Sequence, residues 1–162
     1  MSAIRRNKGF TLIEILIVVI ILGILAAIVI PQFSNASTAA KTSSVTTTAQ
    51  SLRSQIALFK LQHNDNLPAA GANFWTLMTT ATDASGAAYV SGTSTSGPFG
   101  PYMQSIPANA LNQLTTVVDV PGALYGTTVN STVCGWAYDY TTGAGTGRLY
   151  GTGTDSKTLV GP

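Results

Sequence analysis

The chain has 162 residues, of which 45% are hydrophobic and only 9% are charged. Eight Lys and Arg residues against six Asp and Glu residues give a net charge of +2, which is too small for a nucleic-acid-binding surface. One Cys and one His exclude an intrachain disulfide and any metal site built from several Cys or His residues.

The first predicted element is a membrane-spanning helix over residues 10–30. From Leu12 to Ile30 every residue is apolar except Glu14. A helix of this length spans roughly 31 Å, which matches the hydrocarbon thickness of a bilayer. β-branched residues dominate the segment, but in lipid only a helix lets one segment satisfy its own backbone. We therefore predict a single membrane pass.

The charges around this segment predict its orientation. Arg5, Arg6 and Lys8 precede it, and the next positive residue is Lys41. An excess of positive charge marks the cytoplasmic side, so the N-terminus is expected in the cytoplasm and the bulk of the chain on the other side. A secretory signal cleaved within the small residues 36–40 is the alternative interpretation.

Glu14 favours a retained helix, because a carboxylate inside an apolar segment is costly and indicates a functional site. Nothing within the segment neutralises this charge. We therefore expect its partner to be a positive charge on another copy of the chain.

The sequence Lys8-Gly9-Phe10-Thr11-Leu12-Ile13-Glu14, followed by the apolar run and Pro31, resembles the prepilin signal of type IV pilins and type II secretion pseudopilins. The resemblance implies a leader of residues 1–9, which a prepilin peptidase and methyltransferase removes by cutting between Gly9 and Phe10. The same enzyme would then N-methylate Phe10. Glu14 falls on the family's assembly glutamate, which meets the N-terminal amine of a neighbouring subunit. The implied partners are further copies of the chain and an inner-membrane assembly platform.

Loss of the leader changes the charge balance. Removal of three of the eight positive residues leaves five against six negative ones, a net side-chain charge of −1. The basic character therefore belongs to the leader rather than to a ligand site.

The helix is predicted to continue through residues 31–66 as an amphipathic segment. Pro31 lacks an N–H group, so a kink or local melt is expected near Ala27. Apolar residues and one histidine recur every three or four positions and form one stripe. The stripe consists of Val45, Ala49, Leu52, Ile56, Phe59 and His63, and the polar residues 64–66 with Pro68 end the helix. His63 is predicted to be a residue at the core edge, with metal ligation as the alternative.

Residues 67–162 are predicted to form a globular β domain. Residues 74–78 suggest a short helical turn, and residues 115–120, 135–140 and 147–150 alternate as strands, with a turn at 141–146. The expected fold is α+β, with a small antiparallel sheet packed on the second half of the long helix. Trp136, Tyr138 and Tyr140 share one strand face, which indicates core, although a sugar-binding face is the alternative.

The C-terminal half carries a second, looser resemblance. Gly100-Pro101-Tyr102, Pro107 and Gly135-Trp136 resemble the pattern of the G-type major pseudopilins. That resemblance implies calcium as a bound ion, but Asp119, Asp139 and Asp155 are isolated and form no carboxylate cluster. We predict no metal site and no cofactor.

Cys134 is the only cysteine, which excludes the C-terminal intrachain disulfide of many type IV pilins. We expect it to be buried, with an intermolecular bridge as the alternative.

The sequence contains no motif that predicts an enzyme site. No G-x-S-x-G motif occurs, and the glycines of residues 143–147 lack the Lys and Ser/Thr of a phosphate loop. The sequence predicts a structural subunit of a type II secretion pseudopilus in the bacterial inner membrane, with its C-terminal domain in the periplasm. A surface type IV pilus is the alternative, followed by an unprocessed membrane-tethered binding domain.

Overall fold

A computed structural model describes residues 9–94, 96–123, 128–129, 131, 133–140 and 145–160. The chain divides into two compact units, residues 1–39 and residues 40–162. The leader cations Arg5, Arg6 and Lys8 lie outside the described residues, as do residues 141–144 of the predicted turn.

Helix α1 runs from Leu12 to Gln62 and contributes to both units. It continues through Pro31 as helix, so the local melt that we expected near Ala27 is not found. A proline removes one of the hydrogen bonds of the helix, and the helical residues on both sides keep the backbone in the helical conformation. The helix ends where Asn64 and Asp65 take positive φ angles of 52° and 69°, which confirms the predicted end.

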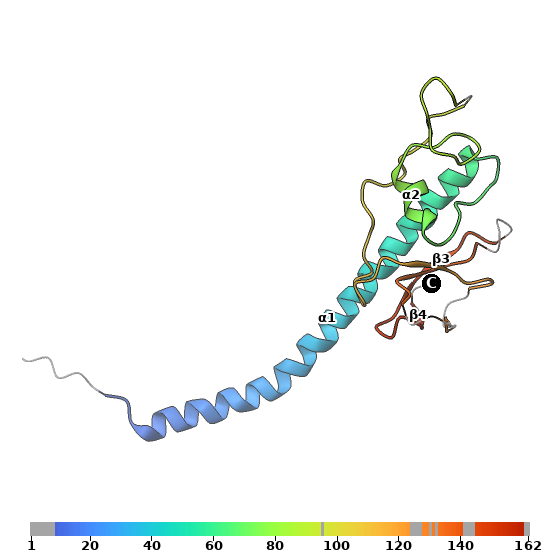
Figure 1. The fold of residues 1–162 in the computed structure, drawn as a ribbon. Coiled ribbons are helices and arrows are strands. Elements are labelled where there is room, and N and C mark those ends of the chain that lie inside the picture. Colours follow the sequence, from blue (N-terminus) through green and yellow to red (C-terminus); the bar gives the residue numbers. More distant parts are fainter. Residues whose placement is uncertain are drawn as a thin grey trace, which may run out of the picture. The chain divides into compact units, whose positions relative to one another are not determined.

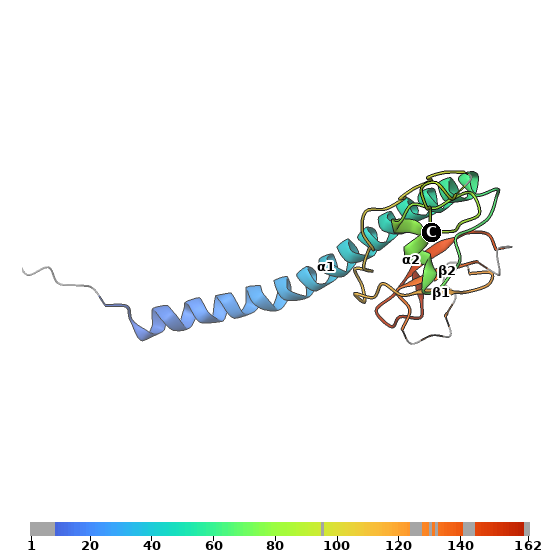
Figure 2. The same cartoon turned by 45° about the horizontal axis from the view of Figure 1, so that its top comes forward.

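In the second unit, the predicted stripe of α1 is confirmed. Five of its members are at most 2% exposed, and His63 is 1% exposed. The short helix α2, Asn73–Thr79, buries Phe74, Trp75 and Met78 in the same hydrophobic cluster. Both views show α2 beside the C-terminal end of α1 (Figures 1 and 2).

The sheet has four short strands in the order β1-β2-β3-β4: Val117–Asp119, Trp136–Tyr138, Leu149–Thr152 and Leu159–Val160. The predicted hairpin is confirmed, because Ala137 of β2 pairs antiparallel with Tyr150 of β3. The prediction of a wholly antiparallel sheet is wrong, since β1 pairs parallel with β2. The connection between them is long enough to turn the chain round before it re-enters the sheet. Strand β4 was not predicted.

Alternation along β2 and β3 separates two hydrophobic clusters. Trp136, Tyr138 and Leu149 join the cluster that contains the α1 stripe, which confirms the core assignment of this strand face. Ala137 and Tyr150 belong to the second cluster.

Gly151 of β3 lies against Val45 of α1. A Cβ atom at this position would overlap the Val45 side chain, so the close approach of helix and strand requires glycine here.

Candidate functional site

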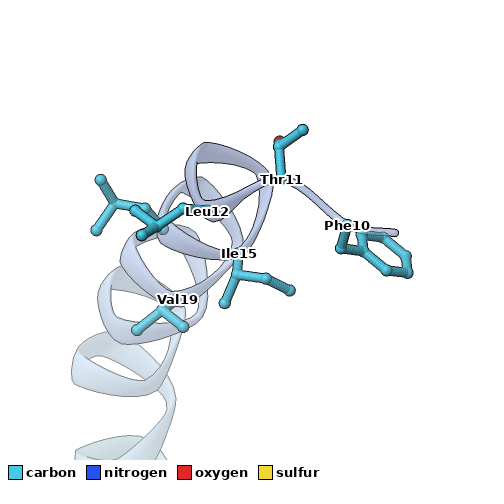
Figure 3. Close-up of a pocket in the computed structure, with 6 residues that line it drawn as sticks. Phe10, Thr11, Leu12, Ile15 and Val19 are labelled. Carbon is cyan, nitrogen blue, oxygen red and sulfur yellow. The ribbon is translucent and has the colours of Figure 1, made fainter. Parts of the chain in front are cut away.

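The start of α1 holds the residues that the sequence singled out. Gly9, Phe10 and Thr11 precede the first helical residue, and all three are exposed. Phe10 is 83% exposed, and its ring stands away from the helix (Figure 3). The Gly9–Phe10 peptide bond thus lies in non-helical, accessible backbone immediately before the helix.

Thr11 and Glu14 form a reciprocal cap on this helix. The Glu14 Oε2 atom accepts hydrogen bonds from the Thr11 backbone N–H and from the Thr11 hydroxyl, each at 2.7 Å. The Thr11 Oγ1 atom accepts the Glu14 backbone N–H at 3.3 Å. This arrangement is a capping box, which satisfies backbone donors that the first turn leaves without partners.

The cap adds a feature that the sequence analysis missed. Thr11 provides Glu14 with two hydrogen bonds from within the same chain, while the predicted positive partner on another copy stays a prediction. The T-x-x-E spacing of Thr11 and Glu14 was the signal that could have revealed this. Both bonds come from uncharged groups, so the negative charge itself stays uncompensated by them.

Beyond the cap, the helix surface is apolar on all sides. The hydrophobic side chains from Leu12 to Phe33 include no buried residue, and the least exposed large one, Val29, is 43% exposed. An open hollow of about 550 Å³ lies among Phe10, Thr11, Leu12, Ile15, Leu16 and Val19 (Figure 3). A helix that is apolar all round needs lipid or other helices as its surroundings. Length and composition make α1 the one candidate membrane span among the described residues.

Both ring nitrogens of His63 lie within hydrogen-bond distance of groups in the same unit. Its Nδ1 lies 2.8 Å from the Phe59 carbonyl oxygen and its Nε2 lies 2.9 Å from the Thr82 hydroxyl. Its ring stacks on Phe59 with 3.8 Å between centroids. The histidine therefore occupies a core position, as predicted, and both nitrogens are engaged.

The three aspartates considered for calcium accept hydrogen bonds from backbone N–H groups, two of them from segments distant in the sequence. The Asp139 carboxylate accepts the Gly122 and Thr146 backbone N–H groups, and Asp119 accepts the Tyr140 N–H. Asp155 accepts two backbone N–H groups and the Thr158 hydroxyl, and these bonds lower its pKa to about 2. Within the described residues, no group of three or more His, Cys, Asp or Glu side chains lies close enough to hold a metal ion.

Cys134 is fully buried, as predicted. Burial raises the pKa of its thiol to about 11, so the reactive thiolate is scarce near neutral pH.

Residues of the looser C-terminal pattern contact one another and the end of α1. Trp136 Nε1 donates a hydrogen bond to the Pro107 carbonyl oxygen at 3.1 Å, which joins two parts of the pattern. A Cβ atom on Gly135 would overlap the Leu114 backbone, so the Gly-Trp pair requires glycine. The Tyr102 hydroxyl donates to Gln62 Oε1 at 2.6 Å, near the end of α1. The pattern residues thus tie the loop and the sheet to the helix.

Comparison with known proteins finds a family that matches the N-terminal segment. The family described as "Prokaryotic N-terminal methylation motif" matches residues 4–30. Residues 4–30 match this family, and the chain is similar over part of its length to type IV pilins and type II secretion pseudopilins. The structure agrees with this family in its α+β class, with a long apolar N-terminal helix and a small mixed sheet.

Relatives of both branches of the family match. The major component of the type IV narrow pilus of Thermus thermophilus is 46% identical over 57 residues, covering 35% of this chain and 49% of the relative. The type II secretion system core protein G of Dickeya chrysanthemi is 37% identical over 60 residues, covering 37% and 39%. The type IV major fimbrial protein of Dichelobacter nodosus is 72% identical over 29 residues, covering 18% and 19%.

These relatives are matched over less than half of their own length. No solved structure matches the chain. The chain is therefore similar to pilins and pseudopilins over part of its length, and it has one N-terminal helix long and apolar enough to span a membrane.

Proposed function

We propose that the chain is a processed, self-assembling subunit of a type II secretion pseudopilus. The observation that carries this proposal is the start of α1, where an accessible Gly9–Phe10 bond leads directly into a capped helix whose first half is apolar on every face. Such a helix cannot be stable in water by itself, so the subunit needs first a membrane and then neighbouring helices. We assign no catalytic residue to this chain.

Processing is proposed to remove residues 1–9 on the cytoplasmic side of the inner membrane. The positive leader residues support this orientation, in which the globular unit lies in the periplasm. A prepilin peptidase would cut after Gly9 and methylate the new amine of Phe10, after which an inner-membrane platform would extract the subunit into the filament. The segments that follow are the assembly helix 10–30, the amphipathic helix 31–66 and the domain 67–162.

Glu14 is proposed to select the register of assembly. The two Thr11 hydrogen bonds hold its carboxylate in place at the positive end of the helix dipole. Cleavage creates a cationic amine on Phe10, and two opposite charges in a low-dielectric environment attract strongly. The amine of an entering copy would therefore settle beside the fixed Glu14 carboxylate of its neighbour, since leaving either charge unpaired is costly.

The pseudopilus is favoured over the surface pilus by the second half of the chain. The residues that resemble the pattern of G-type pseudopilins support this choice, and two of them, Trp136 and Pro107, are joined by a hydrogen bond. The single, buried Cys134 lacks a partner for an intrachain disulfide. The surface pilus is the second candidate, supported by the relatives named as pilus and fimbrial subunits. We propose assembly without a bound cofactor, calcium included, and chelation should leave fibre yield unchanged.

Intact-mass spectrometry of sheared surface fibres and of washed membranes tests the proposal. We expect a chain that begins at N-methylated Phe10 and is confined to the membrane and periplasmic fraction. Abundant processed protein in sheared surface fibres would favour the pilus instead. An uncut chain starting at Met1 would contradict both and leave a membrane-tethered domain.

The variant Gly9→Val isolates the processing step. A bulky β-branched side chain at the proposed cleavage position should block the cut, so that only the full-length mass is found. A normal mature mass in this variant would refute the assigned bond. Gly23→Ala is the matched control, because Gly23 lies within the apolar helix, far in sequence from the cleavage position, and a Cβ atom there meets nothing within 4 Å.

A further inference from the structure

Charges in the chain are segregated along the sequence. Between Lys60 and Arg148 there is no Lys or Arg residue, whereas this stretch contains four aspartates. We call residues 61–147 the acidic stretch. Its aspartates are Asp65, Asp83, Asp119 and Asp139.

The fold brings the two cations that border this stretch to one place. Lys60 and Arg148, together with Arg53, line a hollow of about 200 Å³ whose floor includes Ile56 and Leu67. Arg53 and Lys60 stand two helical turns apart on α1, and Arg148 lies directly before β3. We call this hollow the cationic groove. The described residues that line it include three positive side chains and no negative one.

Arg53 is fixed in the groove by its own unit. Its Nε atom donates to the Leu149 carbonyl oxygen at 2.8 Å, and its guanidinium lies over the Tyr150 ring, 4.6 Å from the centroid. Burial lowers the pKa of this guanidinium, Tyr150 opposes that effect, and the positive charge of Arg148 adds to it. Arg148 is therefore close enough for the two positive charges to repel each other.

Lys60 and Arg148 are the two cations of the groove that are held less firmly than Arg53. Lys60 pairs with Asp65 at 3.5 Å, but the side chains are 39% and 87% exposed, so solvent weakens the pair. Arg148 is exposed. Gathering like charges costs free energy in the isolated subunit, and an anionic partner would recover it.

We propose that the cationic groove receives the acidic stretch of a second copy of the chain, with Asp83 as the entering carboxylate. This inference rests on the proposed filament function. Charge complementarity within one sequence supports it: one copy offers three clustered cations, and the other offers a stretch without any basic residue. Pairing two different surfaces of identical subunits produces an open filament where the rotation between subunits does not close into a ring.

Asp83 is a half-buried residue whose carboxylate is fixed in position. Its Oδ1 atom accepts the Ser85 N–H and hydroxyl and the Ala87 N–H, so the carboxylate is held at the start of a turn. Among the described residues the ion pair is that of Lys60 with Asp65, so Asp83 has no cationic partner in this part of the chain. Asp155 is a weaker candidate because it lies outside the acidic stretch and two residues from Lys157.

Charge reversal in the full-length, processed protein tests the inference. The readout is the fraction of processed subunit that sediments as fibres from sheared cells and from membranes. We expect Arg148→Glu to lower this fraction roughly tenfold, equivalent to about 1.4 kcal/mol, because the substitution places like charges opposite each other. Asp83→Lys should lower it similarly, and the double variant Asp83→Lys/Arg148→Glu should restore it. Lys157→Glu, with the same charge change outside the groove, is the control and should assemble normally.

Three results would overturn the inference, and each differs from a failure of the proposed function. Normal fibres from Arg148→Glu would remove the groove from the interface while leaving the filament itself intact. A loss in Arg148→Glu that Asp83→Lys does not repair would exclude the acidic stretch of a second copy as the occupant. Equal losses in Arg148→Glu and Lys157→Glu would indicate a general effect of net charge. Failure of the proposed function would instead appear as wild-type protein that is uncut or never sediments as fibres.

Discussion

Helix α1 behaves differently in its two halves. From Leu12 to Phe33 its apolar side chains are exposed, with values from 43% at Val29 to 84% at Leu12. From Val45 to Phe59 the stripe residues are at most 2% exposed. A continuous helix therefore has two kinds of surroundings: the second half is covered by its own unit, whereas the first half depends on lipid or on other copies.

The difference lies in the residue pattern rather than in helix propensity. The first half is apolar on every face, which suits a uniform apolar environment. In the second half Ser, Thr and charged residues occupy the outer face, and hydroxyls such as those of Thr46 and Thr48 donate to carbonyl oxygens one turn earlier. On the proposed function, the first half packs against other helices in the filament, whereas the buried stripe of the second half supports the fold of the globular unit. Substitutions in the apolar first half and in the buried stripe should therefore have separate consequences.

The largest expected effect on folding is that of Phe59→Ala. Removing this buried ring leaves a cavity under His63 and Tyr102 and should lower the free energy of unfolding of the globular unit by about 3–5 kcal/mol. Phe33→Ala is the matched control, because Phe33 is 72% exposed. Urea titration of the detergent-solubilised protein measures both. Equal losses from the two variants would contradict the division between the halves.

Gly151→Ala should have the next largest effect. The added methyl group overlaps Val45 and should force the helix away from β3, costing about 1–3 kcal/mol of unfolding free energy. Gly23→Ala adds the same methyl group to the first half, where nothing lies within 4 Å, and should leave the stability of the globular unit unchanged. Thermal unfolding of both variants measures the contrast. A fully stable Gly151→Ala protein would show that α1 does not approach the sheet this closely.

Thr11→Val should affect only the start of the helix. The substitution removes the cap hydroxyl but keeps the side-chain shape, and it should cost about 1 kcal/mol of local helix stability. Hydrogen exchange in lipid or detergent should become faster in the first turn, while exchange in the sheet stays unchanged. Thr11→Ser retains the hydroxyl and should behave like the wild type. Unchanged exchange in Thr11→Val would refute the cap.

The smallest effect is expected at Cys134. Because burial raises the pKa of its thiol to about 11, a thiol reagent at pH 8 should react only slowly with the folded protein and rapidly in urea. Cys134→Ala should leave assembly unchanged. Rapid labelling of the folded protein, or a disulfide-linked dimer in fibres, would contradict the buried position.

Local patterns account for what the sequence predicted correctly. The spacing of Val45, Ala49, Leu52, Ile56 and Phe59 identifies the buried helix face because a helix repeats every 3.6 residues. Alternation likewise identifies Trp136 and Tyr138 as core residues of one strand face. The cap could also have been predicted, since the T-x-x-E spacing of Thr11 and Glu14 is a local signal.

Features that depend on distant pairing were not predictable in this way. The direction of β1 beside β2 depends on the path of the chain between Asp119 and Trp136, and β4 is only two residues long. The cationic groove requires Arg148 to approach two α1 residues that are far away in the sequence. The gap without Lys or Arg was visible in the sequence, but only the fold brings its two ends together.

The central claim is that the first half of α1 directs assembly while the second half supports an independent fold. Fibre yield of Glu14→Ala, measured together with its mature mass and its urea unfolding curve, tests this most directly. The account predicts a correctly cut, N-methylated and normally stable protein that sediments as fibres at a small fraction of the wild-type yield. Fibres at wild-type yield from this variant would contradict the account.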